Sequence, residues 1–193
     1  MSKLKELVLK NRSYRGFDRS VNQTRQELLS LIDHARLMPS TRNFQPLKYF
    51  IVNEDELVTK IQSHTKWAGS LTDIKLPFEG TEPTSFIVIV HDTLIDANIG
   101  AFQKDVGIAG AAITLAAAEQ SLGCCMIGAF NPQGIKNVLN LAENLAPVLV
   151  IAVGSPIEDI ILTDCENGDV TYYRGDNNLH YVPKRTLEEI VLN

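Results

Sequence analysis

The segment SFIVIVH at residues 85–91 restricts the possible folds more than any other part of the chain. Almost all of its residues are apolar, and it lacks the alternation of polar and apolar residues that marks a strand with one face in water. Such a run predicts a strand covered on both faces, so that other layers must pack above and below it. We therefore expect residues 85–91 to form a central strand of a sheet.

A long alanine-rich segment and a second apolar run are candidates for neighbouring elements. Residues 105–122 predict a buried helix whose small side chains let neighbours approach closely, with Gly123 as its C-terminal stop. The run APVLVIAVG at residues 146–154 predicts another strand. The remaining predicted elements are helices at 2–10 and 54–64, a helix from Thr24 that ends before Pro39, a strand at 48–52, a helix opening at Asn131, a strand near Ile160, a turn-rich stretch RGDNN at 174–178 and a short final helix capped by Thr186.

The order of these elements favours an α+β fold. Helices and strands interleave without a strict βαβ rhythm, and no GxGxxG motif follows a strand, which argues against a Rossmann domain and a TIM barrel. We expect a mixed central β-sheet flanked by helices. Since no repeat, low-complexity tract or linker divides the sequence, residues 1–193 are expected to form a single domain.

Composition narrows the classes of partner. The net charge of -5 argues against nucleic acid and against an anionic membrane surface, because phosphate groups select basic proteins. The three cysteines form neither a disulfide framework nor a CxxC zinc motif, and no apolar run reaches the ~20 residues that span a bilayer. These features predict a cytoplasmic protein with no metal site, whose partner is a small molecule or another protein.

Two basic clusters could bind an anion. The segment NRSYRGF places Arg12, Ser13 and Arg15 close together, and arginine forks and a serine hydroxyl are suitable donors for a phosphate. Lys184 and Arg185 stand before the final helix. Considered separately, the first cluster could be a solvated basic loop and the second a surface charge pair.

A polar loop, PSTRNFQP at residues 39–46, precedes a predicted strand. It brings the hydroxyl and amide groups of Ser40, Thr41, Asn43 and Gln45 to a loop, which is a common location for binding residues. The alternative is an ordinary polar turn.

Taken together in order, RSYRGF, PSTRNFQP, LGCCMIGAF and VPKRTLEEI resemble the nitroreductase family over nearly the whole chain. The resemblance implies an FMN cofactor. The residues implied to bind its phosphate and ribityl chain are Arg12, Ser13, Arg15, Lys184 and Arg185. Relatives often carry a further basic residue before Arg12, where this chain has Asn11.

The resemblance also implies a homodimer with flavin sites at the interface. Pro39, Ser40, Thr41 and Asn43 would reach the flavin of the partner subunit. Met126, Ile127, Gly128 and Ala129 would line the isoalloxazine ring, with the Gly128 N–H near flavin N5. Relatives place an asparagine in the region here spelled HTKWAGS, at residues 64–70, and Lys66 or a backbone group could replace it.

The activity implied is reduction of nitroaromatics, quinones or similar electrophiles by NADH or NADPH, with ping-pong kinetics and no catalytic side chain. Other flavin reactions remain open: enone reduction, dehalogenation or ring dehydrogenation. Two alternatives outside the enzyme class also remain open. One is a flavin-binding or regulatory module with little turnover, and the other is a protein-interaction domain without a cofactor. The four histidines are scattered, and the sequence assigns no role to any of them.

Overall fold

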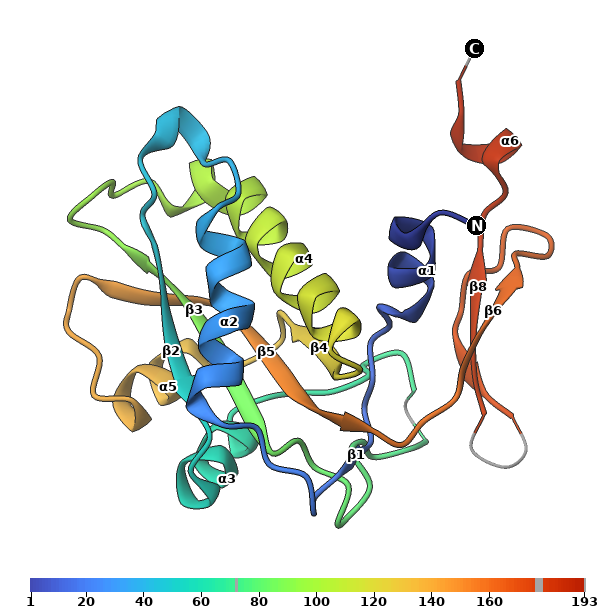
Figure 1. Ribbon diagram of the computed structural model, residues 1–193, viewed down its shortest axis with the longest axis horizontal. Coiled ribbons are helices and arrows are strands. Elements are labelled where there is room, and N and C mark those ends of the chain that lie inside the picture. The colour runs from blue at the N-terminus through green and yellow to red at the C-terminus, as the bar shows by residue number, and fades with distance from the viewer. Residues whose placement is uncertain (72, 176–178, 193) are drawn as a thin grey trace.

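A computed structural model of the chain describes residues 1–71, 73–175 and 179–192. Its larger sheet is built around strand β3 (Ser85–Asp92), every residue of which is buried. Strands β2 (Leu47–Val52) and β5 (Leu145–Pro156) pair with the two edges of β3, both antiparallel. The prediction of a central strand at residues 85–91 is confirmed (Figure 1).

Alternate side chains of β3 enter two separate cores. Phe86, Val88 and Val90 pack with residues of α3 (Asp55–Ser63) and α5 (Pro132–Val138). Ile87 and Ile89 pack on the other side with residues of α2 (Arg25–Arg36) and α4 (Gln103–Glu119), which lie next to each other across the sheet (Figure 1). Each of these five side chains contributes about 1.5–3 kcal/mol by leaving water.

The outer edge of β5 carries two short strands, one after the other. Strand β4 (Gly123–Ile127) pairs with residues 150–154, and β1 (Phe17–Asp18) pairs with Ser155 and Pro156. The chain before β1 consequently runs beside β4, where Ser13 and Cys124 form a parallel bridge. Two segments of the predicted site are thus neighbours because both use the same edge of β5.

Helix ends follow the capping signals in the sequence. Thr24 and Glu27 form a capping box at α2, and Thr186 and Glu189 form another at α6 (Leu187–Ile190). Asn131 caps α5, with Pro132 in its first turn. The remaining helical segments are α1 (Lys3–Lys10) and the short 3-10 turns η1 (Thr41–Asn43) and η2 (Ile99–Phe102). Among the described residues, no helix is both long enough and apolar enough to cross a membrane.

The prediction that Gly123 stops the alanine-rich helix is wrong. Helix α4 ends at Glu119, the left-handed residue after it is Ser121 (φ 60°), and Gly123 is the first residue of β4. A Cβ on Gly123 would lie 2.8 Å from atoms of Tyr14 and Pro156. A glycine is needed here because the N-terminal segment (residues 11–15) and the end of β5 leave no room for a side chain.

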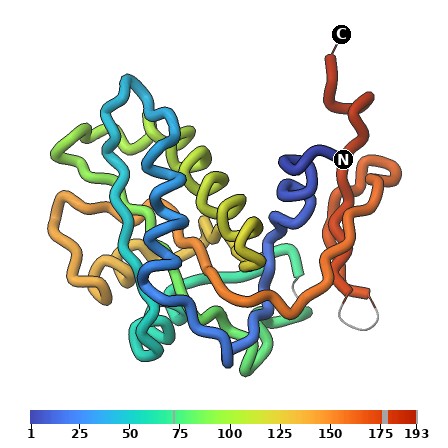
Figure 2. The backbone as a smooth tube through the Cα atoms, viewed as in Figure 1, coloured from blue at the N-terminus to red at the C-terminus, as the bar shows by residue number. Residues whose placement is uncertain are grey.

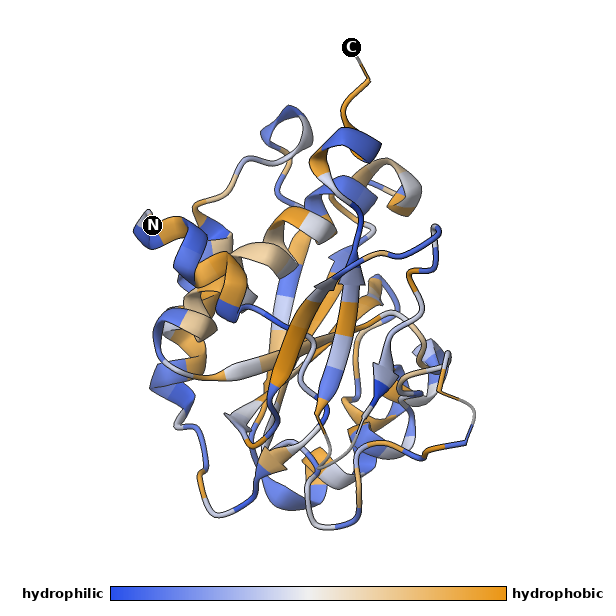
Figure 3. Cartoon of the chain, turned by 90° about the vertical axis from the view of Figure 1, so that its right-hand side faces the viewer, coloured by the Kyte–Doolittle hydropathy of each residue, from blue (hydrophilic) through white to orange (hydrophobic). Residues whose placement is uncertain are grey.

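A second, three-stranded sheet follows β5. Its order is β6 (Ile160–Asp164), β8 (His180–Lys184), β7 (Tyr173–Arg174), with β6 and β8 parallel and β7 antiparallel to β8. Figure 2 shows this sheet at one side of the molecule, across from α1, and Figure 3 turns it toward the viewer. The turn predicted at RGDNN lies partly at residues 176–178, outside the described residues.

The α+β class is confirmed, and the two sheets together contain both parallel and antiparallel strand pairs. All five strands of the larger sheet pair antiparallel, so the expected mixture is not found among them. Parallel pairing occurs between β6 and β8 and at the Ser13–Cys124 bridge.

The carboxylate of Glu158 joins the second sheet to the N-terminal segment. It forms a buried ion pair with Arg174 of β7, and its Oε2 accepts the Arg15 main-chain N–H at 2.5 Å. Both side chains of the ion pair are less than a tenth exposed. Such a pair is costly to break from one side, because the remaining charge is left in a poorly hydrated place. Glu158 therefore fixes how the second sheet faces residues 11–15.

Candidate functional site

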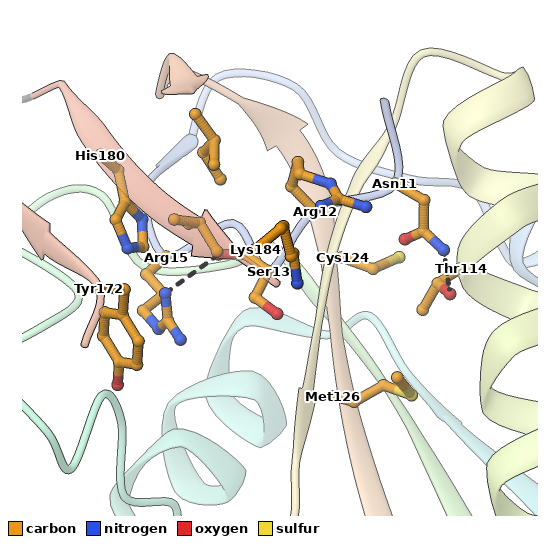
Figure 4. A pocket seen from close by; sticks show the side chains of 12 residues that line it. Asn11, Arg12, Ser13, Arg15, Thr114, Cys124, Met126, Tyr172, His180 and Lys184 are labelled. Carbon is orange, nitrogen blue, oxygen red and sulfur yellow. Dashed lines mark hydrogen bonds between the residues drawn. The ribbon is translucent and has the colours of Figure 1, made fainter. Parts of the chain in front are cut away.

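A cavity of about 310 Å³ lies between the N-terminal segment, α4, β4 and the second sheet. Five of the predicted cofactor residues line it: Arg12, Ser13, Arg15, Met126 and Lys184. Figure 4 shows Arg15, Tyr172 and His180 on one side of the cavity and Asn11 with Thr114 on the opposite side. Residues more than 170 positions apart in sequence thus contribute to one site.

The N-terminal segment is fixed to its neighbours mainly through its backbone. The Tyr14 N–H donates to the Cys124 carbonyl at 3.0 Å, beside the Ser13–Cys124 bridge. Asn11, at the end of α1, donates from its side-chain amide to Thr114 Oγ1 at 2.9 Å. Asn11 therefore secures the segment to α4 at the position where relatives are expected to carry a basic residue.

The basic side chains of the cavity have donors to spare. Arg12 uses Nη2 to bond the Val8 carbonyl at 2.7 Å, and the Arg15 guanidinium lies over the Tyr172 ring, 5.0 Å from its centroid. The Nε atoms of both arginines are buried without a hydrogen-bond partner among the described residues. Burial lowers the pKa of Arg12, with the nearby Tyr14 hydroxyl opposing that shift. An anionic ligand fits this donor set, because it would satisfy the buried N–H groups and offset the cost of burying cations together.

His180, which the sequence reasoning left without a role, also lines the cavity. It is 1% exposed, and neither ring nitrogen has a hydrogen-bond partner among the described residues. Burial, and then the neighbouring charges of Arg15 and Arg174, lower the pKa of His180 to about 4. One signal could have found it: His180, Val182 and Lys184 alternate along β8 and all three line the cavity, as side chains on one face of a strand do.

The four residues predicted to line the flavin ring differ in burial. Met126 is exposed and is the one of these four residues that lines the cavity. Ile127 is buried in the core, and Gly128 and Ala129 are exposed outside the cavity lining. A Cβ added to Gly128 would meet no atom within 4 Å, so there is open space beside its backbone. The Ala129 carbonyl accepts the Lys66 N–H at 2.8 Å, which brings the segment at residues 64–70 next to this end of β4.

Arg185 and the polar loop do not reach the cavity in this chain. Arg185 is exposed and faces Glu189 and the Gly168 carbonyl, each at 3.5 Å. Thr41 and Asn43 lie in η1, and Pro39 and Ser40 line a separate cavity of about 150 Å³. The loop is fixed to Asp105 of α4. Asp105 lies nine residues before Thr114, which lines the larger cavity, and the helical rise separates the two by about 13 Å along the helix axis.

Asp105 holds the polar loop with three hydrogen bonds. Its carboxylate accepts from Ser40 Oγ and from the Thr41 N–H, both at 2.7 Å, and from Thr41 Oγ1 at 2.6 Å. Burial opposes ionisation of Asp105, but these bonds prevail and lower its pKa. The anchor is needed because Arg42, Asn43 and Gln45 all have positive φ angles, a strained conformation outside glycine.

Comparisons with known proteins agree with one another. Residues 8–155 match the family model described as "Nitroreductase family". The chain is 23% identical over 179 residues to "Putative NAD(P)H nitroreductase YodC" of Bacillus subtilis, covering 78% of this chain and 89% of that protein. Among solved structures, a nitroreductase family protein of Streptococcus pneumoniae is similar with a TM-score of 0.72 and 18% identity, covering 99% of this chain and 100% of that one. An FMN-dependent nitroreductase of Clostridium difficile has a TM-score of 0.65 and 21% identity, covering 79% of this chain and 87% of that one.

Replacing the anchor should destabilise the fold. We expect Asp105→Ala to lower the free energy of unfolding by about 2–3 kcal/mol, the scale of one or two hydrogen bonds to a charged group. The matched control is Asp33→Ala, since the exposed Asp33 carboxylate forms an ion pair with Arg36 on the same helix, and such a surface pair is worth less than about 1 kcal/mol.

The same pair of variants tests the pKa of Asp105. Because folding lowers its pKa, Asp105 stabilises the protein above the ordinary value of 3.8 and loses this contribution as pH falls below it. Urea unfolding at several pH values should therefore show a shallower acid slope for Asp105→Ala than for the wild type. An unchanged slope together with unchanged stability at pH 7 would contradict the anchoring role.

Proposed function

The chain belongs to the nitroreductase family of oxidoreductases, and from this membership we propose that it is an FMN-dependent enzyme that uses NADH or NADPH to reduce small electrophilic substrates. The observation that carries the proposal is the cavity lined by Arg12, Arg15 and Lys184. Although the whole protein is acidic, this cavity concentrates positive charge and buried N–H donors that have no partner in the described part of the chain. FMN carries one terminal phosphate and therefore suits such a donor set.

The chain's own residues would bind and orient the cofactor. Arg12, Arg15 and Lys184 would hold the phosphate and ribityl oxygens, and Ser13 would add its exposed hydroxyl. The open space beside the Gly128 backbone would admit a flat ring, and Met126 would cover part of it with its thioether side chain. FMN bound here would supply hydride transfer from the nicotinamide to a nitroaromatic, quinone or similar oxidant, the two substrates reacting in turn.

Binding of the cofactor tests the proposal most directly. The purified protein should be yellow and should release FMN, rather than FAD, on denaturation. Arg15→Ala should weaken FMN binding by about 1.5–3 kcal/mol, the range for a hydrogen bond to a charged group, as measured by titration of the apoprotein. Arg25→Ala is the control, because Arg25 is exposed in α2 and does not line the cavity. Release of FAD, absence of flavin, or equal affinities for both variants would refute the cofactor assignment.

Turnover separates the enzyme from a flavin-binding module of the same fold. We expect NADH or NADPH to bleach the bound flavin rapidly under anaerobic conditions, and a nitroaromatic or a quinone to restore its colour. Steady-state rates should give parallel double-reciprocal lines, since one product leaves before the second substrate binds. A bound flavin that neither nicotinamide reduces would favour the storage or regulatory module instead.

The position of the polar loop supports a homodimer. Within one chain, Ser40 and Thr41 are fixed near the start of α4, away from the cavity, so they could serve a flavin only in a partner subunit. Large apolar side chains are exposed near both termini: Leu4 in α1, and Leu187, Ile190, Val191 and Leu192 in the segment that leaves the body of the molecule (Figure 3). In α4 itself, Gly107, Ala111 and Ala112 are not fully buried within one chain.

We therefore expect an obligate homodimer with an interface above about 2,000 Å², to which α4 contributes. Sedimentation of the holoprotein at micromolar concentration should give twice the mass of one chain. The opposite result, a stable monomer that retains reducible FMN, would rule out both the shared site and the trans roles of Pro39, Ser40, Thr41 and Asn43.

A further inference from the structure

His180 is a buried histidine whose hydrogen-bonding groups face a cavity instead of the protein. It begins β8, is 1% exposed and lines the basic cavity (Figure 4). Neither Nδ1 nor Nε2 has a partner among the described residues. Buried polar side chains in folded proteins are nearly always hydrogen-bonded, because an unsatisfied buried group has lost its bonds to water without replacing them. A partner from outside the chain would replace those bonds.

The groups around the imidazole do not satisfy it. The His180 main-chain N–H donates to the Asp159 carbonyl at 3.0 Å. The Tyr172 and His180 rings pack edge to face, with their centroids 5.5 Å apart. The nearby guanidinium groups of Arg15 and Arg174 have no acceptor atoms. The Glu158 carboxylate binds Arg174 and the Arg15 main-chain N–H, and among the described residues no hydrogen bond joins it to the ring.

The charge state of the ring follows from these surroundings. Burial and the two guanidinium groups hold the pKa of His180 near 4, so the ring is neutral at pH 7. A neutral imidazole has one N–H donor and one acceptor nitrogen. Next to Arg12, Arg15 and Lys184 it adds a donor to the cavity without adding a fourth positive charge.

We propose that His180 is a further binding residue of this site, which donates an imidazole N–H to an oxygen of bound FMN. The inference rests on the proposed function, because it takes the cavity to be the FMN site. The other polar groups that line the cavity are mostly donors, so the group they bind must be rich in acceptor oxygens. FMN offers such oxygens on its phosphate and on its ribityl chain and ring, and the experiment separates these two sources.

The test compares His180→Phe and His180→Gln with the wild type, each titrated as apoprotein with FMN and with riboflavin, which lacks the phosphate. We expect His180→Phe to weaken FMN binding about tenfold, as loss of one hydrogen bond would. His180→Gln should restore much of the affinity, because its amide can donate. Weakening confined to FMN assigns the bond to the phosphate, and equal weakening for both flavins assigns it to the ribityl chain or ring.

Two controls keep the outcome clear. His34→Gln changes an exposed histidine of α2 that does not line the cavity and should leave both affinities unchanged. Nitrogen-15 NMR of the wild type, which needs no variant to fold, should show the His180 imidazole N–H become protected when FMN saturates the site.

The proposal for His180 fails if His180→Phe binds both flavins as tightly as the wild type, or if FMN leaves the imidazole signals unchanged. A wild-type protein that binds neither flavin would instead contradict the proposed function itself.

Discussion

Strand β3 has no face exposed to water, because helices cover the larger sheet on both sides. Its alternate side chains enter two cores, which require helices on both sides of the sheet. Its two edges require partners, which are β2 and the long β5. Because β5 extends beyond β3, its outer edge can hold both β4 and β1, and this shared edge brings Ser13 and Tyr14 beside Cys124 of β4. The cavity is thus a consequence of how the central strand is covered.

Much of the fold could be predicted because it depends on local signals. The capping boxes at Thr24 and Thr186, the Asn131–Pro132 helix start and the apolar run at 85–91 each act within a few residues of sequence. Gly123 was misread because its requirement is not local: it lacks a side chain to make room for Tyr14 and Pro156, which come from distant parts of the chain. The antiparallel pairing throughout the larger sheet likewise depends on which strands meet, a choice that periodicity does not reveal.

The site could be predicted in part, because its motifs are local in the sequence while its burial and contacts are not. Arg12, Ser13, Arg15, Met126 and Lys184 meet at one cavity, as the resemblance implied, while Ile127 belongs to the core and Arg185 lies at the surface. His180 was missed because a single histidine carries no motif, and its importance depends on burial and on the lack of a partner. The polar loop was recognised, but its hydrogen bonds to Asp105 join positions more than sixty residues apart.

The cavity joins parts of the chain that are synthesised at different times. Residues 11–15 line one part of the cavity, and residues of β8 line another. During synthesis residues 11–15 leave the ribosome more than 160 residues before the strand that carries His180 and Lys184. Glu158 is synthesised before Arg174, so the carboxylate that orients the second sheet precedes the strand with which it pairs. A chain that has been made only as far as β7 therefore carries the buried apolar residues of the larger sheet but lacks the β8 residues that line the cavity.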